Sequence, residues 1–170
     1  MKRILVFLLF TAAVTGCQNV TPSSPLGDTG DLWQVKKLDR LQRCTLVSRS
    51  IEFSTPYGVE TVWVGIDHDG IVGLRTRQRP LSPEALDQIS VRVDNHDPFT
   101  HPQLSPSGQI ARFSTSASQQ IIAQLKQGQF LRVQLVFRPG RQLSVRRLPL
   151  EGFANALIKH NMCKVISSSL

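Results

Sequence analysis

Short runs of alternating hydrophobic and polar residues, separated by turn residues, make up most of the chain from Leu32 onward. This two-residue period predicts half-buried β-strands, because successive side chains of a strand point to opposite faces. Two pairs of runs form predicted hairpins, one around His68-Asp69-Gly70 and one around Arg138-Pro139-Gly140-Arg141. The predicted strands are Leu32–Lys37, Cys44–Phe53, Glu60–Asp67, Ile71–Arg77, Ile89–Val93, Ile110–Ser114, Phe130–Phe137 and Gln142–Leu148.

Two segments have the spacing of α-helices instead. Ser116 to Ser118 can cap a helix that runs through Lys126. Leu150–Met162 forms the second helix, and Cys163 closes it. These elements together predict a mainly β, antiparallel fold with two short helices, either a β-sandwich or a partly closed barrel.

The remaining segments contain residues that interrupt regular structure. Asn95–Gly108 contains three prolines and is expected to be a long loop. Pro83–Asp87 follows a proline-rich break and is compatible with a single helical turn.

The first sixteen residues have the parts of a secretion signal. Lys2 and Arg3 form its positive start, and the apolar run Ile4–Val14 is about 11 residues long, too short for the roughly 20 that a spanning helix needs. Val14-Thr15-Gly16-Cys17 then has the form of a bacterial lipobox. In such a signal the Cys thiol receives diacylglycerol, and cleavage makes that Cys the new N-terminus. We therefore expect Cys17 to carry a lipid anchor, and an ordinary signal peptide with a cysteine nearby is the alternative.

The residues that follow Cys17 indicate where the anchor lies. Gln18 occupies the position at which inner-membrane lipoproteins of the enterobacterial type carry Asp. Its presence favours the outer membrane, with the domain facing the periplasm or, alternatively, the cell surface. Residues 17–31 are rich in Ser, Thr, Pro and Gly and are expected to be a flexible tether. Residues 32–170 are then a single periplasmic β-rich domain.

Two cysteines remain once Cys17 is lipidated. Cys44 and Cys163 would form one disulfide in an oxidising periplasm. Closing a loop of about 120 residues stabilises a fold by roughly 4–5 kcal/mol in the chain-entropy account. Two free thiols or a thiol nucleophile are the alternatives, although the chain has no Cys-x-x-Cys motif.

Composition and charge narrow the class of protein. The chain has 170 residues, of which 41% are hydrophobic and 19% charged, which suits one globular domain and excludes a mainly disordered or collagen-like chain. Lys and Arg number 20 against 12 Asp and Glu, a net charge of +8. Removal of the signal takes away Lys2 and Arg3. Nucleic-acid binding is not expected, because the predicted compartment is wrong and no binding motif is present.

Arginines gather in two places along the chain. Arg75, Arg77 and Arg79 alternate and would share one face of a sheet, and a second cluster near the later hairpin contains Arg132, Arg138, Arg141, Arg146 and Arg147. Arginine makes bidentate contacts with phosphate and carboxylate groups. The clusters could bind anionic lipid headgroups, lipopolysaccharide, peptidoglycan or an acidic protein, or could be a solvated face that aids solubility. Trp63 is either a core residue or an interface anchor.

Candidate chemistry is weak. The chain has neither Gly-x-Ser-x-Gly nor Ser-x-x-Lys, so we expect no enzyme activity. Two groups have the composition of metal sites, Asp67, His68 and Asp69, and Asn95, His96, Asp97 and His101. Turn chemistry explains the first group, and nearby prolines indicate that the second is an ordinary surface loop. His160 is expected to be an exposed polar residue, and no metal or cofactor is expected.

The C-terminal third contains an ordered set of motifs. A short helix ending in Leu-x-x-Gly is followed by a strand pair and then by Leu-x-Leu-x-Gly-Phe-x-x-Ala; in this chain the segments are Phe113-Ser114, Ile121–Gly128, Leu131–Phe137 and Leu148–Leu157. This pattern resembles the invasion-associated locus B family of secreted bacterial proteins. The resemblance implies a β-sandwich-like domain and no catalytic residues. Within the last motif, Gly152 would allow close packing at the helix start, and Phe153 would fill the core.

The chain departs from that family in lacking the mid-domain cysteines of many members and in its expected lipid anchor. Taken together, the sequence predicts a non-enzymatic, outer-membrane-anchored lipoprotein that binds other envelope proteins, as an accessory or structural subunit of a secretion system or as a virulence-associated factor. The alternative is a periplasmic module that binds an anionic ligand or inhibits a cell-wall enzyme. The residues expected to contact a partner are Arg75, Arg77, Arg79, Arg138, Arg141 and Trp63.

Overall fold

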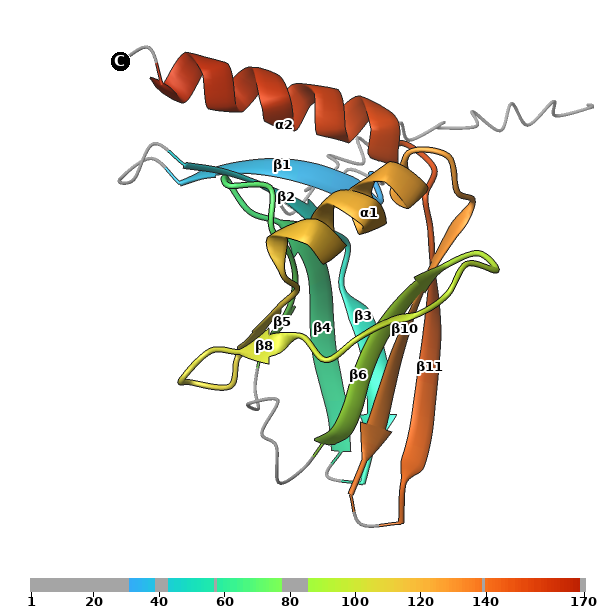
Figure 1. Ribbon diagram of the computed structural model, residues 1–170. Coiled ribbons are helices and arrows are strands. Elements are labelled where there is room, and N and C mark those ends of the chain that lie inside the picture. Colours follow the sequence, from blue (N-terminus) through green and yellow to red (C-terminus); the bar gives the residue numbers. More distant parts are fainter. Residues whose placement is uncertain (1–30, 39–42, 57, 78–85, 139, 169–170) are drawn as a thin grey trace, which may run out of the picture.

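The computed structural model describes residues 31–38, 43–56, 58–77, 86–138 and 140–168, which form two antiparallel sheets and two helices (Figure 1). The first sheet contains β1 (Trp33–Leu38), β2 (Arg43–Ser48), β3 (Ile51–Thr55), β4 (Gly58–Ile66), β5 (Val72–Thr76), β8 (Gln103–Leu104) and β9 (Ile110–Arg112). The second contains β6 (Leu86–Val93), β7 (Phe99–Thr100), β10 (Phe130–Phe137) and β11 (Gln142–Pro149). The helices are α1 (Thr115–Leu125) and α2 (Phe153–Ser168).

The arrangement is sandwich-like, as the alternating pattern predicts, and the described strands do not close into a barrel. The core lies between the two sheets, where every second residue of a strand is buried. The inward side chains include Val62, Val64 and Ile66 of β4 and Leu131, Val133 and Leu135 of β10. Burying a side chain of this size stabilises a fold by about 1.5–3 kcal/mol, so these two strands contribute much of the core.

The strand β4 organises the first sheet. It pairs with β3 along its first half, with β2 near its end, and with β5 on its other side. The predicted strand Cys44–Phe53 is therefore two strands, interrupted at Arg49-Ser50. Where the ladder is broken, the Ser48 hydroxyl accepts a hydrogen bond from the Val64 N–H at 3.0 Å. The buried N–H thus keeps a partner, which is what a buried backbone group requires.

The helix α1 packs against β5 and β6, with Ile121 buried in the core. Its N-cap is Ser114, whose hydroxyl accepts a hydrogen bond from the Ala117 N–H at 3.3 Å. The predicted cap at Ser116 to Ser118 is therefore a few residues too late. Ser118 is fully buried and accepts from the Val72 N–H at 3.0 Å, so it joins the helix to β5.

The helix α2 lies across β1 and β2 at one end of the sandwich (Figure 1). It begins at Phe153 rather than Leu150, because Gly152 has φ +78, a left-handed conformation that favours glycine. A Cβ at Gly152 would meet nothing within 4 Å, so the expected role in close packing is wrong and the residue turns the chain instead. Phe153 is fully buried, as predicted, and packs edge-on against Trp33 with ring centroids 4.9 Å apart.

Two further segments differ from expectation. The predicted loop Asn95–Gly108 contains the short strands β7 and β8, which pair with β6 and β9. The strand β6 begins at Leu86, which is buried and pairs with Phe137, so the helical turn expected at Pro83–Asp87 is wrong at its last two residues. Its first three residues lie outside the described part of the chain.

Candidate functional site

The expected lipid anchor, Cys17, lies outside the described residues, whose first member is Asp31. Asp31 and Leu32 line the same surface depression as Glu151, Asn155 and Lys159. The described chain therefore begins beside the first turns of α2. Among the described helices, none is long and apolar enough to cross a membrane.

The predicted disulfide between Cys44 and Cys163 is confirmed. The two Cα atoms are 6.1 Å apart, and the cysteines are separated by 119 positions in the sequence. The bond joins β2 to α2, so the early part of the first sheet and the last helix form one covalent unit.

His160 lies beside this disulfide and is only 1% exposed, so the expectation of an exposed residue is wrong. Its Nε2 atom is 3.3 Å from the Cys44 carbonyl oxygen, while its Nδ1 atom has no hydrogen-bond partner among the described residues. Burial lowers the pKa of His160 below its ordinary value of 6.5, and the hydrogen bond to Cys44 opposes this shift. Burial therefore favours the neutral form of His160, at the end of the sandwich that α2 covers.

An open groove of about 490 Å³ lies on the outer face of the first sheet. Trp63 of β4 pairs with Arg75 of β5, and the next outward pair is Gly65 with Gly73. A Cβ on Gly73 would lie 2.9 Å from the Ala111 carbonyl oxygen, too close for any other residue without a backbone shift. The two glycines therefore form a floor without side chains, beside the indole and the guanidinium.

The rim of this groove is basic. Lys36, Arg75, Arg77 and Arg112 line it, and Asp67 is the single acidic residue among the described lining residues. Arg112 Nη2 lies 3.9 Å from Asp67 Oδ2, and this long contact between an exposed and a half-buried side chain contributes little to stability. Asp67 is itself committed to its turn, since its Oδ1 accepts from the Ile71 N–H at 2.9 Å.

Two hydrogen bonds hold the backbone of Arg77 at the end of β5. Its N–H donates to Glu60 Oε1 and to the Thr61 carbonyl oxygen, each at 3.2 Å. Glu60 is buried at 5% exposure, so the carboxylate fixes the end of β5 from the inside. Arg75 and Arg77 consequently share the outer face, as their alternation predicts, while Arg79 lies outside the described residues.

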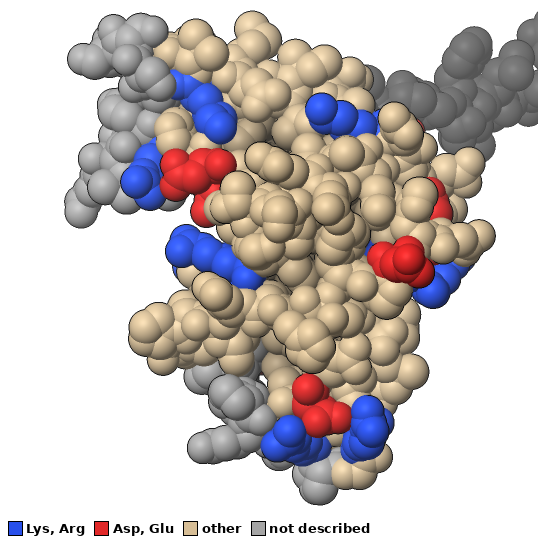
Figure 2. Space-filling view, in the orientation of Figure 1, with Lys and Arg blue, Asp and Glu red and all other residues tan. Residues whose placement is uncertain are grey.

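Four of the five arginines of the second cluster contact other residues of the fold. Arg138 and Arg141, at the hairpin between β10 and β11, each form an ion pair of 3.1 Å with Asp87. Arg146 donates to the Glu52 carbonyl oxygen at 2.8 Å, and the Arg147 guanidinium lies 4.0 Å from the centre of the Phe130 ring. On the face shown in Figure 2, the basic side chains form separate patches rather than one continuous surface.

The first group that resembled a metal site has a structural explanation. The Asp67 carboxylate accepts hydrogen bonds within its own turn, and His68 Nδ1 accepts from the Cys44 N–H at 3.3 Å. His96, Asp97 and His101 are exposed. No three His, Cys, Asp or Glu side chains converge to hold a metal ion within the described ranges.

Some parts of this site could be predicted from the sequence. The turn at Asp69-Gly70 sets a hairpin register in which Trp63 faces Arg75 and Gly65 faces Gly73, so the glycine floor was predictable. His160 follows Leu157 at helical spacing, which was a signal for burial. The contributions of Lys36 and Arg112 to the groove could not be predicted from the sequence, because the neighbours of their strands depend on how the whole sheet is assembled.

The chain is similar to known proteins at its N-terminus and in its fold. Residues 1–18 match the prokaryotic membrane lipoprotein lipid attachment site, which supports a lipoprotein anchored in a membrane. A solved structure, that of invasion associated protein B from Bartonella henselae, is similar to this chain with a TM-score of 0.49 and 19% sequence identity, over 77% of this chain and 92% of that chain. No curated protein matches this chain in sequence.

Proposed function

We propose that this chain is a non-enzymatic lipoprotein that binds an acidic segment of another envelope protein in the groove beside Trp63. The observation that carries the proposal is the placement of an outward-facing indole next to Arg75 and Arg77 over a floor of two glycines. Lys36 and Arg112 extend the positive rim. The protein would serve as an accessory or structural subunit of an envelope assembly, for secretion or virulence.

The chemistry of the groove fits a carboxylate-bearing partner. Tryptophan and arginine are the residues that most often dominate the binding energy of protein interfaces. An arginine guanidinium also binds a carboxylate through two parallel hydrogen bonds, which a lysine cannot do. Because glycine leaves the floor open, a peptide backbone could lie close to β4 and β5.

The lipid anchor supports the same function. A domain attached to the membrane through Cys17 is held where envelope proteins are concentrated, so even a groove of modest affinity would be occupied. Gln18 favours the outer membrane and a domain that faces the periplasm.

A second candidate is a module that captures a small anionic ligand. The groove volume of about 490 Å³ favours it, because ligand pockets commonly measure roughly 300–1,000 Å³. The two candidates predict different material bound to the purified protein.

The test uses the full-length lipidated protein in its native membranes, crosslinked, purified in mild detergent and analysed by mass spectrometry. The groove variant combines Arg75→Glu with Arg77→Glu. The matched control makes the same charge change with Arg138→Glu and Arg141→Glu, at the hairpin. We expect the wild type and the control to retain a small set of envelope proteins in fixed ratio, and the groove variant to lose them. A Cys17→Ala variant should lose them as well.

Two results would contradict the proposal. Retention of the same proteins by the groove variant would exclude the groove as the binding surface. Wild-type protein that emerges alone, but binds a soluble anion through Arg75, would favour the second candidate.

A further inference from the structure

The outward side of α2 is hydrophobic. Ile158, Met162, Val165 and Ile166 are 59%, 59%, 68% and 58% exposed. Their spacing of four, three and one residues places them on one stripe of the helix, which we call the α2 stripe. The opposite side of α2 is also apolar and is buried, with Phe153, Ala156 and Leu157 against the sheet.

The α2 stripe is unusual within this molecule. A helix that covers a sheet normally presents polar residues to water. The helix α1 follows that rule, since its exposed positions include Ser116, Gln119 and Gln120. Four of the seven exposed large hydrophobic residues in the described part of the chain belong instead to the α2 stripe. Such a concentration indicates a surface that contacts another apolar phase or partner.

The position of the lipid anchor indicates which phase that is. The described chain begins at Asp31, in a depression shared with Asn155 and Lys159 of α2. Thirteen residues lie between Cys17 and Asp31. Even a fully extended chain of that length spans at most about 50 Å, and α2 itself is about 24 Å long. The part of the domain beside α2 is therefore the part that the anchor holds within about 50 Å of the membrane.

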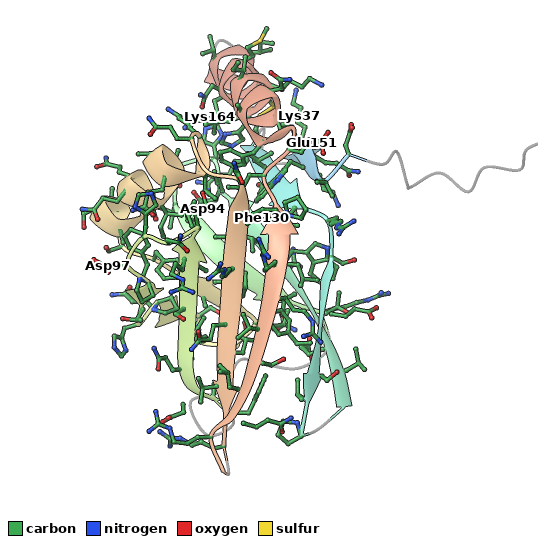
Figure 3. All side chains as sticks on the ribbon, turned by 90° about the vertical axis from the view of Figure 1, so that its right-hand side faces the viewer. Lys37, Asp94, Asp97, Phe130, Glu151 and Lys164 are labelled. Atoms are coloured by element: carbon green, nitrogen blue, oxygen red, sulfur yellow. A yellow bond between two sulfur atoms is a disulfide. The ribbon has the colours of Figure 1, made fainter. Side chains whose placement is uncertain are left out.

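The charges around α2 complement a membrane surface. Lys159 follows Ile158 on the exposed side of the helix, and Lys37 belongs to β1 beside it. Figure 3 shows Lys37 beside the helix, whereas Lys164 follows His160 by one turn on the side of α2 that faces the sheet. Exposed lysine side chains can extend to lipid phosphates while their apolar stems stay near the acyl chains. The acidic residues Asp31 and Glu151 line the depression at the N-terminal end of α2, which Lys159 also lines.

We propose that α2 lies in the interface of the membrane that holds the Cys17 lipid, with the α2 stripe at the boundary of the acyl chains. The domain then stands on the bilayer with the hairpin of β10 and β11 pointing away from it, since that hairpin lies at the opposite end of the sandwich (Figure 1). This proposal depends on the lipid anchor and not on the groove, so the two can fail separately.

The test measures membrane depth at one position of the α2 stripe and one control position. Ile158→Cys and Leu143→Cys have nearly equal native exposure, 59% and 57%, and Leu143 lies near the far hairpin. Each full-length lipidated variant is labelled with an environment-sensitive fluorophore and reconstituted into vesicles of phosphatidylethanolamine and phosphatidylglycerol. Labelling is confined to the new thiol, because Cys44 and Cys163 are bonded to each other. Doxyl-labelled lipids then serve as quenchers.

We expect at least twofold stronger quenching and a blue-shifted emission at position 158 relative to position 143. Adding Met162→Glu and Val165→Glu to the Ile158→Cys protein should remove that difference, and an unchanged thermal transition would show that the fold is intact. Equal quenching at both positions overturns the proposal. So does a blue shift at position 158 without lipid quenching: with crosslinks between copies it assigns the α2 stripe to a second copy of this chain, and without them to another protein.

Discussion

The two ends of the sandwich are closed by different physical means. At the end covered by α2, the contacts are buried: the Cys44–Cys163 disulfide, His160 and the edge-on pair of Trp33 and Phe153. At the other end, the hairpin of β10 and β11 is tied to β6 by exposed ion pairs to Asp87. Water and salt weaken the second kind of contact and hardly reach the first. Stability should therefore depend on the α2 end, while the hairpin end can change at little cost.

The largest effect should come from truncating the aromatic core at the α2 end. Phe153→Ala removes a fully buried ring and should lower the free energy of unfolding by about 3–5 kcal/mol. Leu143→Ala, near the hairpin, is the matched control and should change it by less than about 0.5 kcal/mol, because Leu143 is 57% exposed. Chemical denaturation measures both values, and comparable losses in the two variants would remove the distinction between the ends.

Loss of the disulfide should rank next. The double variant Cys44→Ala and Cys163→Ala should lose about 2–4 kcal/mol, because the unfolded chain is no longer constrained by the cross-link. Reductant should lower the melting temperature of the wild type towards that of the variant and leave the variant unchanged. A melting temperature that is the same with and without reductant would contradict this account.

Acid should weaken the α2 end through His160. Its pKa is lowered by burial, so the unfolded state binds a proton more readily than the folded state below pH 6.5. Stability should be constant above that pH and fall below it, by at most about 1.4 kcal/mol per pH unit. His160→Gln should flatten the profile between pH 7 and pH 5. If the slope persists in that variant, another group is responsible.

The smallest effect should be at the hairpin. Asp87→Asn removes the charge that faces Arg138 and Arg141, whose side chains are 56% and 76% exposed. The loss should be under about 1 kcal/mol at low salt and should vanish at 1 M salt, where exposed charges are screened. Denaturation at the two salt concentrations tests this. A loss that survives high salt would indicate a packing role for Asp87.

The sequence predicted the parts of this molecule that depend on local patterns. The hairpin at Asp69-Gly70 and the strand Phe130–Phe137 follow from alternation and turn chemistry, and the structure contains both. The break at Arg49-Ser50 was missed, because both halves alternate and only pairing with β4 separates them. The arginine clusters looked alike in sequence. Their difference arises from Asp87, which is remote in the chain from Arg138 and close to it in space.

The groove was only partly predictable for the same reason. Trp63 and Arg75 face each other across a hairpin whose register the turn fixes. Arg112 reaches the rim because β9 pairs with β5, a contact between segments almost forty residues apart. The alternation of hydrophobic and polar residues within one segment does not show which distant segment it pairs with.

The packing of Trp33 at the start of β1 has a mechanical consequence. Tension on the chain that precedes β1 is transmitted to this strand, which lies at the edge of the first sheet. Tension at the start of an edge strand peels its hydrogen bonds apart one after another rather than shearing them together. Trp33 resists such peeling, because its indole N–H donates to the Pro149 carbonyl oxygen at 3.2 Å and its ring packs on Phe153. The load therefore passes from β1 into α2 and, through the disulfide, returns to β2 of the same sheet.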